Sequence, residues 1–211
     1  INTQVIDFAI IRNEIIPKRK WKRWSKNYLL RVGEEIWMDH RIRGKANRSN
    51  GELFEKMITR SSDAYWKQGI ACVEKTPEPM RPIKALNSNK GQFVAIYSKQ
   101  AQPDFKGVLC YGRCILFDAK YTSKDRIQQS AVTEKQIETF DRYEEMDALC
   151  FVVVCIQYEH FYRVPWKDWK NMKTLFGHKH MTLEELEKYR VPYKNGMICY
   201  LEGVEIEEQD N

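Results

Sequence analysis

The sequence predicts a mixed α/β protein in which a central mixed β-sheet is flanked by helices. Two short runs of β-forming residues within 108–117 meet at a Gly-Arg pair, which is typical of a β-hairpin. The continuous apolar run 149–156 predicts a strand that is covered on both faces. Apolar residues at helical spacing in 51–67 and 133–147 supply the flanking helices.

The chain has 211 residues, which suits one domain of ordinary size with a sizeable core. Its longest apolar run, 149–156, is too short to cross a bilayer, so we expect no membrane partner. The six cysteines include no Cys-x-x-Cys pair, which favours free thiols and a cytoplasmic location. The spacing of His178, His180 and Cys199 matches no standard zinc site, which favours surface histidines.

The net charge of +6 is concentrated near the N-terminus. Residues 1–50 carry 12 Lys and Arg against 5 Asp and Glu, whereas the remaining residues carry 23 against 24. A basic arm on a nearly neutral body indicates a polyanionic partner and favours nucleic acid over an acidic protein. We therefore divide the chain into a basic N-terminal helical extension (1–46), a core domain (47–204) and an acidic C-terminal tail (205–211).

The predicted helix of the extension combines aromatic and basic residues. Pro17 suits its first turn, and Trp21, Trp24 and Tyr28 recur at helical spacing. One interpretation is an arm that contacts DNA phosphates, and the other is a helix docked through its tryptophans with a solvated basic face. The residues assigned to DNA contact are Lys20, Lys22 and Arg23.

The core opens with a helix, a strand and a long insertion. Asn50 is expected to cap the helix 51–67, in which Glu55 borders the apolar stripe. That carboxylate is either a solvated flank or a third acidic ligand for the site described next. After the predicted strand 69–75, the stretch 77–102 forms a hairpin or an extended loop. Its basic residues suit substrate contact, and those assigned to DNA are Arg81, Lys84 and Lys90.

The hairpin carries the charged residues on which the functional hypothesis depends. Asp104 precedes its first strand, and Asp118 and Lys120 follow the second, so a turn at Gly112 brings all three together. Alternation puts Asp118 and Lys120 on one face and Ala119 on the other. Two carboxylates and an ammonium suit a hard cation and an attacking water. The pattern predicts a metal-dependent nuclease, and the alternative is a group of charges at a solvated sheet end.

A helix follows the hairpin. Thr133 is expected to cap 133–147 and Gln136 to close a capping box, with an inward side formed by Ile137, Phe140 and Tyr143. Beyond the strand 149–156 the sequence predicts a strand (160–164), a short helix or turn (165–172), a capped helix (182–189) and a last strand (197–201).

The order of these blocks is similar to that of the PD-(D/E)xK nuclease superfamily, and within it the chain resembles the RecU-type Holliday junction resolvases. The resemblance extends from about residue 47 to residue 204. The blocks that carry it are Asn50-Gly51 with Glu55, AYWKQGIACVEKTPEP, SKQAQPDFKGVLCYGRCILFDAKYT, the glutamine of EKQIETF, and FVVVCI.

This resemblance implies a PD-(D/E)xK nuclease-like core in a homodimer that cleaves four-way DNA junctions during recombination and repair. It also implies Mg²⁺ as the cofactor, with Mn²⁺ as a possible substitute. The residues that would hold the ion are Asp104, Asp118, Ala119 and Glu55. The residues that would form the catalytic group are Lys120, Glu55, Asp104, Asp118 and Gln136.

The chain departs from the family pattern at two places. Gln102-Pro103-Asp104-Phe105 stands where the family usually has a Thr-Thr-Asp-Tyr segment, and Asp118 stands where Glu is common. Asp118 is one methylene shorter, which changes the reach of its carboxylate. Two alternatives to a junction resolvase stay open: another restriction-like or structure-specific endonuclease of the same core, or a noncatalytic nucleic-acid-binding protein that uses the basic arm.

Overall fold

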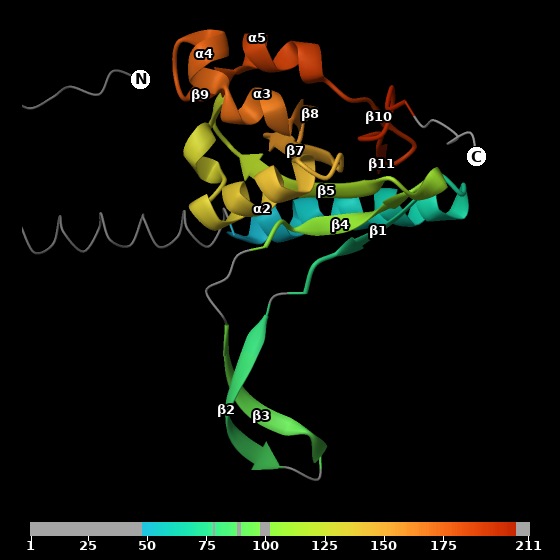
Figure 1. Ribbon diagram of the computed structural model, residues 1–211, viewed down its shortest axis with the longest axis vertical. Helices are drawn as coiled ribbons and strands as arrows, with labels where there is room; N and C mark the ends of the chain where they lie inside the picture. Colours follow the sequence, from blue (N-terminus) through green and yellow to red (C-terminus); the bar gives the residue numbers. More distant parts are fainter. Residues whose placement is uncertain (1–47, 78, 88–89, 98–101, 206–211) are drawn as a thin grey trace, which may run out of the picture. The chain divides into compact units, whose positions relative to one another are not determined.

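The computed structural model describes residues 48–77, 79–87, 90–97 and 102–205 (Figure 1). The predicted helical extension, with Lys20, Lys22 and Arg23, lies outside the described residues, as does most of the acidic tail. Among the described residues, no helix is long and apolar enough to span a membrane.

The centre of the fold is a mixed five-stranded sheet, in agreement with the predicted class. Its strands run in the order β1, β4, β5, β7, β8, and all neighbours are antiparallel except β5 and β7. Parallel neighbours need a crossover connection, and α2 (Glu134–Glu144) lies in the segment that provides it. The strand bounds are β1 Ala71–Lys75, β4 Phe105–Leu109, β5 Cys114–Thr122, β7 Leu149–Ile156 and β8 His160–Pro165.

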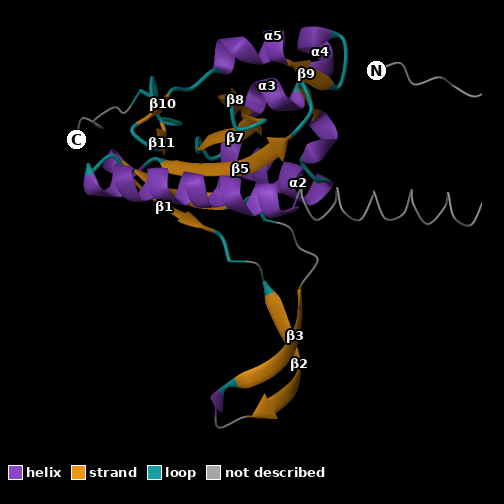
Figure 2. Ribbon diagram, turned by 180° about the vertical axis from the view of Figure 1, so that it is seen from behind, coloured by secondary structure: helices purple, strands orange, loops and turns teal. Residues whose placement is uncertain are grey.

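Helices cover both faces of this sheet (Figure 2). A long helix over residues 48–67 packs on one face, and α2 packs on the other with three short helices. Those short helices are α3 Trp166–Lys170, α4 Met172–Phe176 and α5 Leu183–Leu186. The smaller strands are β2 Met80–Asn87, β3 Gln92–Tyr97, β6 Arg126–Gln128, β9 His180–Thr182, β10 Tyr193–Lys194 and β11 Met197–Ile198.

The alternation of side chains along each central strand separates two hydrophobic cores. In β7, Phe151 and Val153 join the core under the helix 48–67, whereas Val152 and Val154 join the core under α2. Phe117 of β5 stacks between Phe105 and Phe151, with ring centroids 5.0 and 4.8 Å apart. Burial on both faces explains why β7 is apolar at every position.

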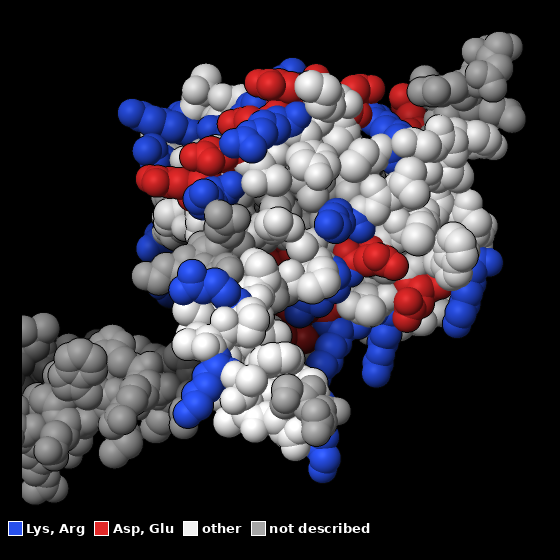
Figure 3. All heavy atoms as spheres, turned by 60° about the horizontal axis from the view of Figure 1, so that its bottom comes forward, with Lys and Arg blue, Asp and Glu red and all other residues white. Residues whose placement is uncertain are grey.

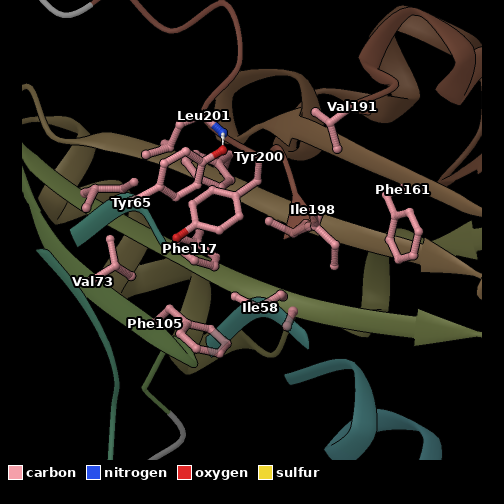
Figure 4. Packing of buried hydrophobic residues seen from close by; sticks show 14 of the residues in the cluster. Ile58, Tyr65, Val73, Phe105, Phe117, Phe161, Val191, Ile198, Tyr200 and Leu201 are labelled. Carbon is pink, nitrogen blue, oxygen red and sulfur yellow. Dashed lines mark hydrogen bonds between the residues drawn. The ribbon is translucent and has the colours of Figure 1, made fainter. Parts of the chain in front are cut away.

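Polar contacts fasten the C-terminal segment to the helix 48–67. The Ser61 hydroxyl accepts a hydrogen bond from the Ile198 backbone N–H (2.9 Å), and the Ser62 and Tyr200 hydroxyls lie 2.8 Å apart. The Tyr65 hydroxyl accepts from the Leu201 N–H at 3.1 Å, beside the buried Tyr200 ring (Figure 4). These bonds satisfy buried polar groups that would otherwise oppose packing.

The predicted β-hairpin is present, although its strands and turn differ from the prediction. β4 begins at Phe105, and β5 continues to Thr122, so Asp118 and Lys120 lie within the second strand instead of after it. A 3₁₀ turn at Cys110–Gly112 replaces the expected tight turn, and the Leu109 N–H donates to the Arg113 carbonyl across it. Positive φ angles within that turn let the longer loop close.

The stretch between β1 and β4 forms a hairpin, which settles the choice between hairpin and extended loop. β2 and β3 pair as a separate antiparallel sheet. The residues of this hairpin whose side chains are described are exposed, including Arg81, Lys84 and Lys90. Two register shifts interrupt the pairing, one of them at Pro82, which has no N–H to donate.

Three details of the sequence prediction are wrong. Asn50 does not cap the first helix, because residues 48–50 are already helical and the Asn50 carbonyl accepts from the Tyr158 hydroxyl. Tyr143 does not face inward; it is 38% exposed near the end of α2. The last strand covers only Met197–Ile198, because the chain turns away at residues 200–203.

Gly107 of β4 offers a test of the sheet. A Cβ at this position would lie 2.0 Å from the Cys72 carbonyl oxygen of β1, and backbone atoms cannot yield as a flexible side chain can. Gly107→Ala should therefore lower the free energy of unfolding by about 2–4 kcal/mol in urea denaturation. Gly51→Ala, a helical position with open space around it, should instead stabilise by about 0.5–1 kcal/mol. If the two substitutions changed the free energy of unfolding equally, the close approach of β1 to Gly107 would not be the cause.

Candidate functional site

The hairpin brings Asp104 and Asp118 face to face. Asp104 immediately precedes β4, and its backbone N–H donates to Asp118 Oδ1 at 3.2 Å. In return, the Ala119 N–H of β5 donates to Asp104 Oδ2 at 3.0 Å. The register that pairs Phe105 with Phe117 produces this reciprocal contact, because it sets the residues on either side of that pair opposite one another.

Asp118 is fully buried, so its charge must be compensated by neighbouring side chains. The Gln136 amide donates to Asp118 Oδ1 at 2.9 Å, and the Lys120 ammonium forms an ion pair with Oδ2. Lys120 is the partner of that second oxygen, as Gln136 is of the first. Lys120 is itself mostly buried, with 21% of its side chain exposed, so the pair is shielded from solvent.

In this group a single lysine, Lys120, faces two carboxyl groups, those of Asp104 and Asp118. Burial, and then the neighbouring Asp118 carboxylate, raise the pKa of Asp104 to about 7. For Lys120, burial by itself favours the neutral form, but the carboxylates of Asp118 and Asp104 outweigh it and raise the pKa of the ammonium. The site therefore combines a charged lysine with an Asp104 carboxyl that binds a proton near neutral pH.

Gln136 has two roles because it sits at the N3 position of α2. Its Oε1 accepts from the Thr133 backbone N–H at 3.0 Å, which closes the predicted capping box. That bond fixes which end of the amide is oxygen, so the Nε2 group is left to face Asp118. The capping box follows from the sequence pattern, whereas only the resemblance pointed to a place near the acidic residues.

Glu55 lies on the helix 48–67, close enough for its charge to raise the pKa of Lys120. Its carboxylate forms an ion pair with Lys75 Nζ at 2.5 Å. Sequence reasoning missed Lys75, because its position opposite Phe105, the neighbour of Asp104, depends on the pairing of β1 with β4. In the described part of the chain, no three His, Cys, Asp or Glu residues are grouped so that they could hold a metal ion. In the structure, Asp104 and Asp118 are therefore in direct hydrogen-bond contact, whereas Glu55 forms an ion pair with Lys75.

The paired carboxylates nevertheless fit a divalent cation. They supply hard oxygen donors, and the pKa of Asp104 is raised first by burial and then by the neighbouring Asp118 carboxylate. A cation bound between them would take the place of that proton. The donor chemistry therefore suits Mg²⁺ or Mn²⁺ better than a soft metal.

The basic residues assigned to DNA are separate from this group. Arg81, Lys84 and Lys90 lie on the exposed β2–β3 hairpin, and within the described part of the chain they make no hydrogen bond or ion pair with Asp104 or Asp118. Figure 3 shows Lys and Arg side chains spread over the face that it presents, with acidic side chains among them. Their assignment to DNA contact stays a prediction.

The fold and the site together define a class. A mixed sheet in which Pro-Asp and Asp-x-Lys meet on adjacent antiparallel strands, with helices on both faces, is the arrangement of PD-(D/E)xK nuclease-like proteins. The model of the family described as RecU, Recombination protein U, matches residues 49–206. This chain belongs to the RecU family.

Curated relatives agree with this assignment. The chain is 27% identical over 207 residues to a protein of Lactobacillus delbrueckii subsp. bulgaricus, a match that covers 90% of each chain. It is 30% identical over 133 residues to a protein of Streptococcus sanguinis, which covers 61% of this chain and 66% of that one. Both relatives carry the name Holliday junction resolvase RecU.

A comparison with solved structures gives a partial match. It is Hjc from Archaeoglobus fulgidus, a Holliday junction resolvase from an archaeal hyperthermophile, with 13% sequence identity and a TM-score of 0.34. The match covers 55% of this chain and 76% of that one. The assignment rests on the family match and not on this likeness.

Because Asp104 binds a proton near neutral pH, the stability of the folded protein should depend on pH. Because the pKa of Asp104 is about 7 in the fold and 3.8 without it, the folded protein binds more protons between these values. The free energy of unfolding of the metal-free protein should fall as pH rises from about 4 to about 7, by up to about 1.4 kcal/mol per pH unit. Urea denaturation in EDTA would measure it.

Two variants isolate that contribution. Asp104→Asn should flatten the decline, since the neutral amide no longer titrates. Asp63→Asn, at an exposed position of the helix 48–67, should keep the parental decline. An unchanged slope in Asp104→Asn would assign the titration to another group.

Gln136 can be tested by separating its contact with Thr133 from its contact with Asp118. Gln136→Ala loses both and should cost about 1–3 kcal/mol at every pH. Gln136→Glu keeps an acceptor for the Thr133 N–H but places a carboxyl against Asp118. It should therefore be near parental stability at pH 5 and clearly destabilised at pH 8, where the new group ionises. Identical pH profiles for the two variants would argue against the Asp118 contact.

Proposed function

We propose that this protein is a structure-selective DNA endonuclease that cleaves Holliday (four-way) junctions by metal-assisted phosphodiester hydrolysis in recombination and repair. The observation that carries the proposal is the buried group of Asp104, Asp118 and Lys120, held in place by Gln136. The names of the RecU relatives supply the substrate class.

The cofactor in this proposal is Mg²⁺, with Mn²⁺ as a substitute. Asp104 and Asp118 would hold it with the Ala119 carbonyl, and Glu55 would join them after leaving its ion pair with Lys75. A bound divalent ion supplies a Lewis acid that makes water more acidic and offsets charge on the scissile phosphate. The proton on the carboxyl pair must leave for the ion to bind, which favours activity above neutral pH.

The remaining residues of the site provide a positive charge and hydrogen bonds at fixed positions. Lys120 is a fixed cation that orients the attacking water or stabilises the charge that develops on the phosphate. Gln136 is a positioning residue, because it acts through Asp118 by occupying one of its oxygens. The backbone N–H of Ala119 does the same for Asp104 by donating to its Oδ2.

A homodimer is part of the proposal because a four-way junction needs two related cuts. Two sites related by a two-fold axis suit a substrate with similar symmetry. Arg81, Lys84 and Lys90 would contact the DNA backbone from the exposed hairpin, and Lys20, Lys22 and Arg23 from the N-terminal extension. The six cysteines are free thiols, which supports a reducing, cytoplasmic environment.

The decisive experiment compares cleavage of synthetic four-way, flap and linear DNA with Mg²⁺, Mn²⁺ or EDTA. The parent should cut four-way junctions only with a divalent ion. Asp104→Asn and Lys120→Ala should each lose at least about 100-fold in cleavage rate and still bind the junction, because they remove transition-state stabilisation rather than the DNA surface. Gel shifts in EDTA would measure that binding.

Matched controls are Asp63→Asn and Lys173→Ala, which change the same residue types at exposed positions away from the carboxylates. Both should cut as the parent does. Preferential cutting of flap or linear DNA would favour another endonuclease of this core. Salt-sensitive binding without any metal-dependent cutting would favour a noncatalytic nucleic-acid-binding protein.

A further inference from the structure

A cavity of about 340 Å³ lies beside the carboxylates, between the sheet and α2. Lys106 of β4 and Leu116 of β5 line its sheet side, and Lys135, Glu138 and Arg142 line its α2 side. Pro103, which precedes Asp104, also lines it, so the cavity adjoins the carboxylate pair. We call it the α2 groove.

The α2 groove is electropositive. Lys106, Lys135 and Arg142 are all exposed, and Glu138 is the acidic residue among its lining residues. Glu138 lies 3.9 Å from Arg142 in a solvent-exposed pair of the i, i+4 type, which is a weak interaction that an incoming anion can replace. Three cations against one carboxylate make the groove suited to a phosphate.

Thr76 gives the groove an independent polar feature. It lines the cavity, is 8% exposed, and its hydroxyl has no hydrogen-bond partner among the described residues. Buried hydroxyls are normally paired, so this unpaired one, itself shielded from solvent, is a donor that a ligand in the cavity would meet only when the Thr76 side chain turns toward it. The Thr76 backbone N–H donates to the Asp104 carbonyl at 2.8 Å, which ties this residue to the carboxylate site.

The spacing of the α2 groove from the carboxylates matches nucleic acid. Leu116 is two residues before Asp118 on the same face of β5, a distance of roughly 7 Å along the strand. Arg142 is six residues beyond Gln136, or roughly 9 Å along α2. Successive phosphates of one DNA strand rise about 3.4 Å along the helix axis and lie farther apart along the winding backbone. The groove therefore lies within a few phosphates of the site.

We propose that the α2 groove binds a backbone phosphate of the strand that is cut, within about three nucleotides of the scissile bond. Lys135, Arg142 and Lys106 bind it as cations, and the Thr76 hydroxyl donates to it. The phosphate fixes how far the strand advances into the site. This inference rests on the proposed endonuclease function and adds a subsite for its substrate.

The first test is charge reversal. The double variant Lys135→Glu/Arg142→Glu should lower kcat/KM on the preferred DNA at least about tenfold. In metal-free binding, the slope of log K against log salt should shrink by about one, the share of one phosphate contact. The control Lys173→Glu/Lys179→Glu makes the same change in net charge at exposed positions outside the groove. An equal loss in both double variants would overturn the groove assignment.

The second test places the phosphate. Single methylphosphonates, which remove one charge each, are introduced at successive positions on either side of the cut. One position within about three nucleotides should slow the parent, and the same substitution should have little further effect in Lys135→Glu/Arg142→Glu. Additive losses at every position would overturn the proposal.

The two proposals fail in different ways. If the parent cuts no junction, flap or linear DNA with either ion, the endonuclease function is wrong and the subsite falls with it. If the parent cuts but the groove variants match the control double variant, the endonuclease function stands and only the subsite is wrong.

Discussion

The burial of the Asp118 carboxylate is the constraint on which the site depends. A charge without solvent contact in the middle of a sheet is tolerated only when cations and donors surround it. Lys120 from the same strand and Gln136 from α2 meet this requirement, and the Asp104 backbone adds a third contact. The position of α2 over the sheet, the register of β4 against β5 and the chemistry of the site are therefore linked at one residue.

The parts of the fold that the sequence predicts are those set by local patterns. The capping box of Thr133 and Gln136, the buried strand β7 and the hairpin containing Asp104 and Asp118 depend on residues close together in the chain. The mixed sheet follows because a helix lies between two predicted strands. Nearly all the acidic and basic residues that meet at the site could be identified from this level of information.

The errors arise where distant contacts decide the outcome. Asn50 has the residue type of a cap, but the helix already includes the residues before it, and Tyr158 contacts its carbonyl from 108 positions away. Glu55 borders an apolar stripe as expected, yet its partner Lys75 is set by how β1 lies beside the helix. Tyr143 fits the helical period and is exposed because α2 ends there. None of these three features can be predicted from the spacing of residues in the sequence alone.

The hydrogen bonds between the helix 48–67 and the C-terminal segment have a consequence for the order of folding. Its bonds join residues 136 to 138 positions apart, whereas the contacts among Asp104, Asp118 and Gln136 span 14 to 18 positions. Closing a longer loop costs more chain entropy, so short-range contacts form more readily than long-range ones. We therefore expect the contacts among Asp104, Asp118 and Gln136 to form before Tyr200 and its neighbours complete the native state.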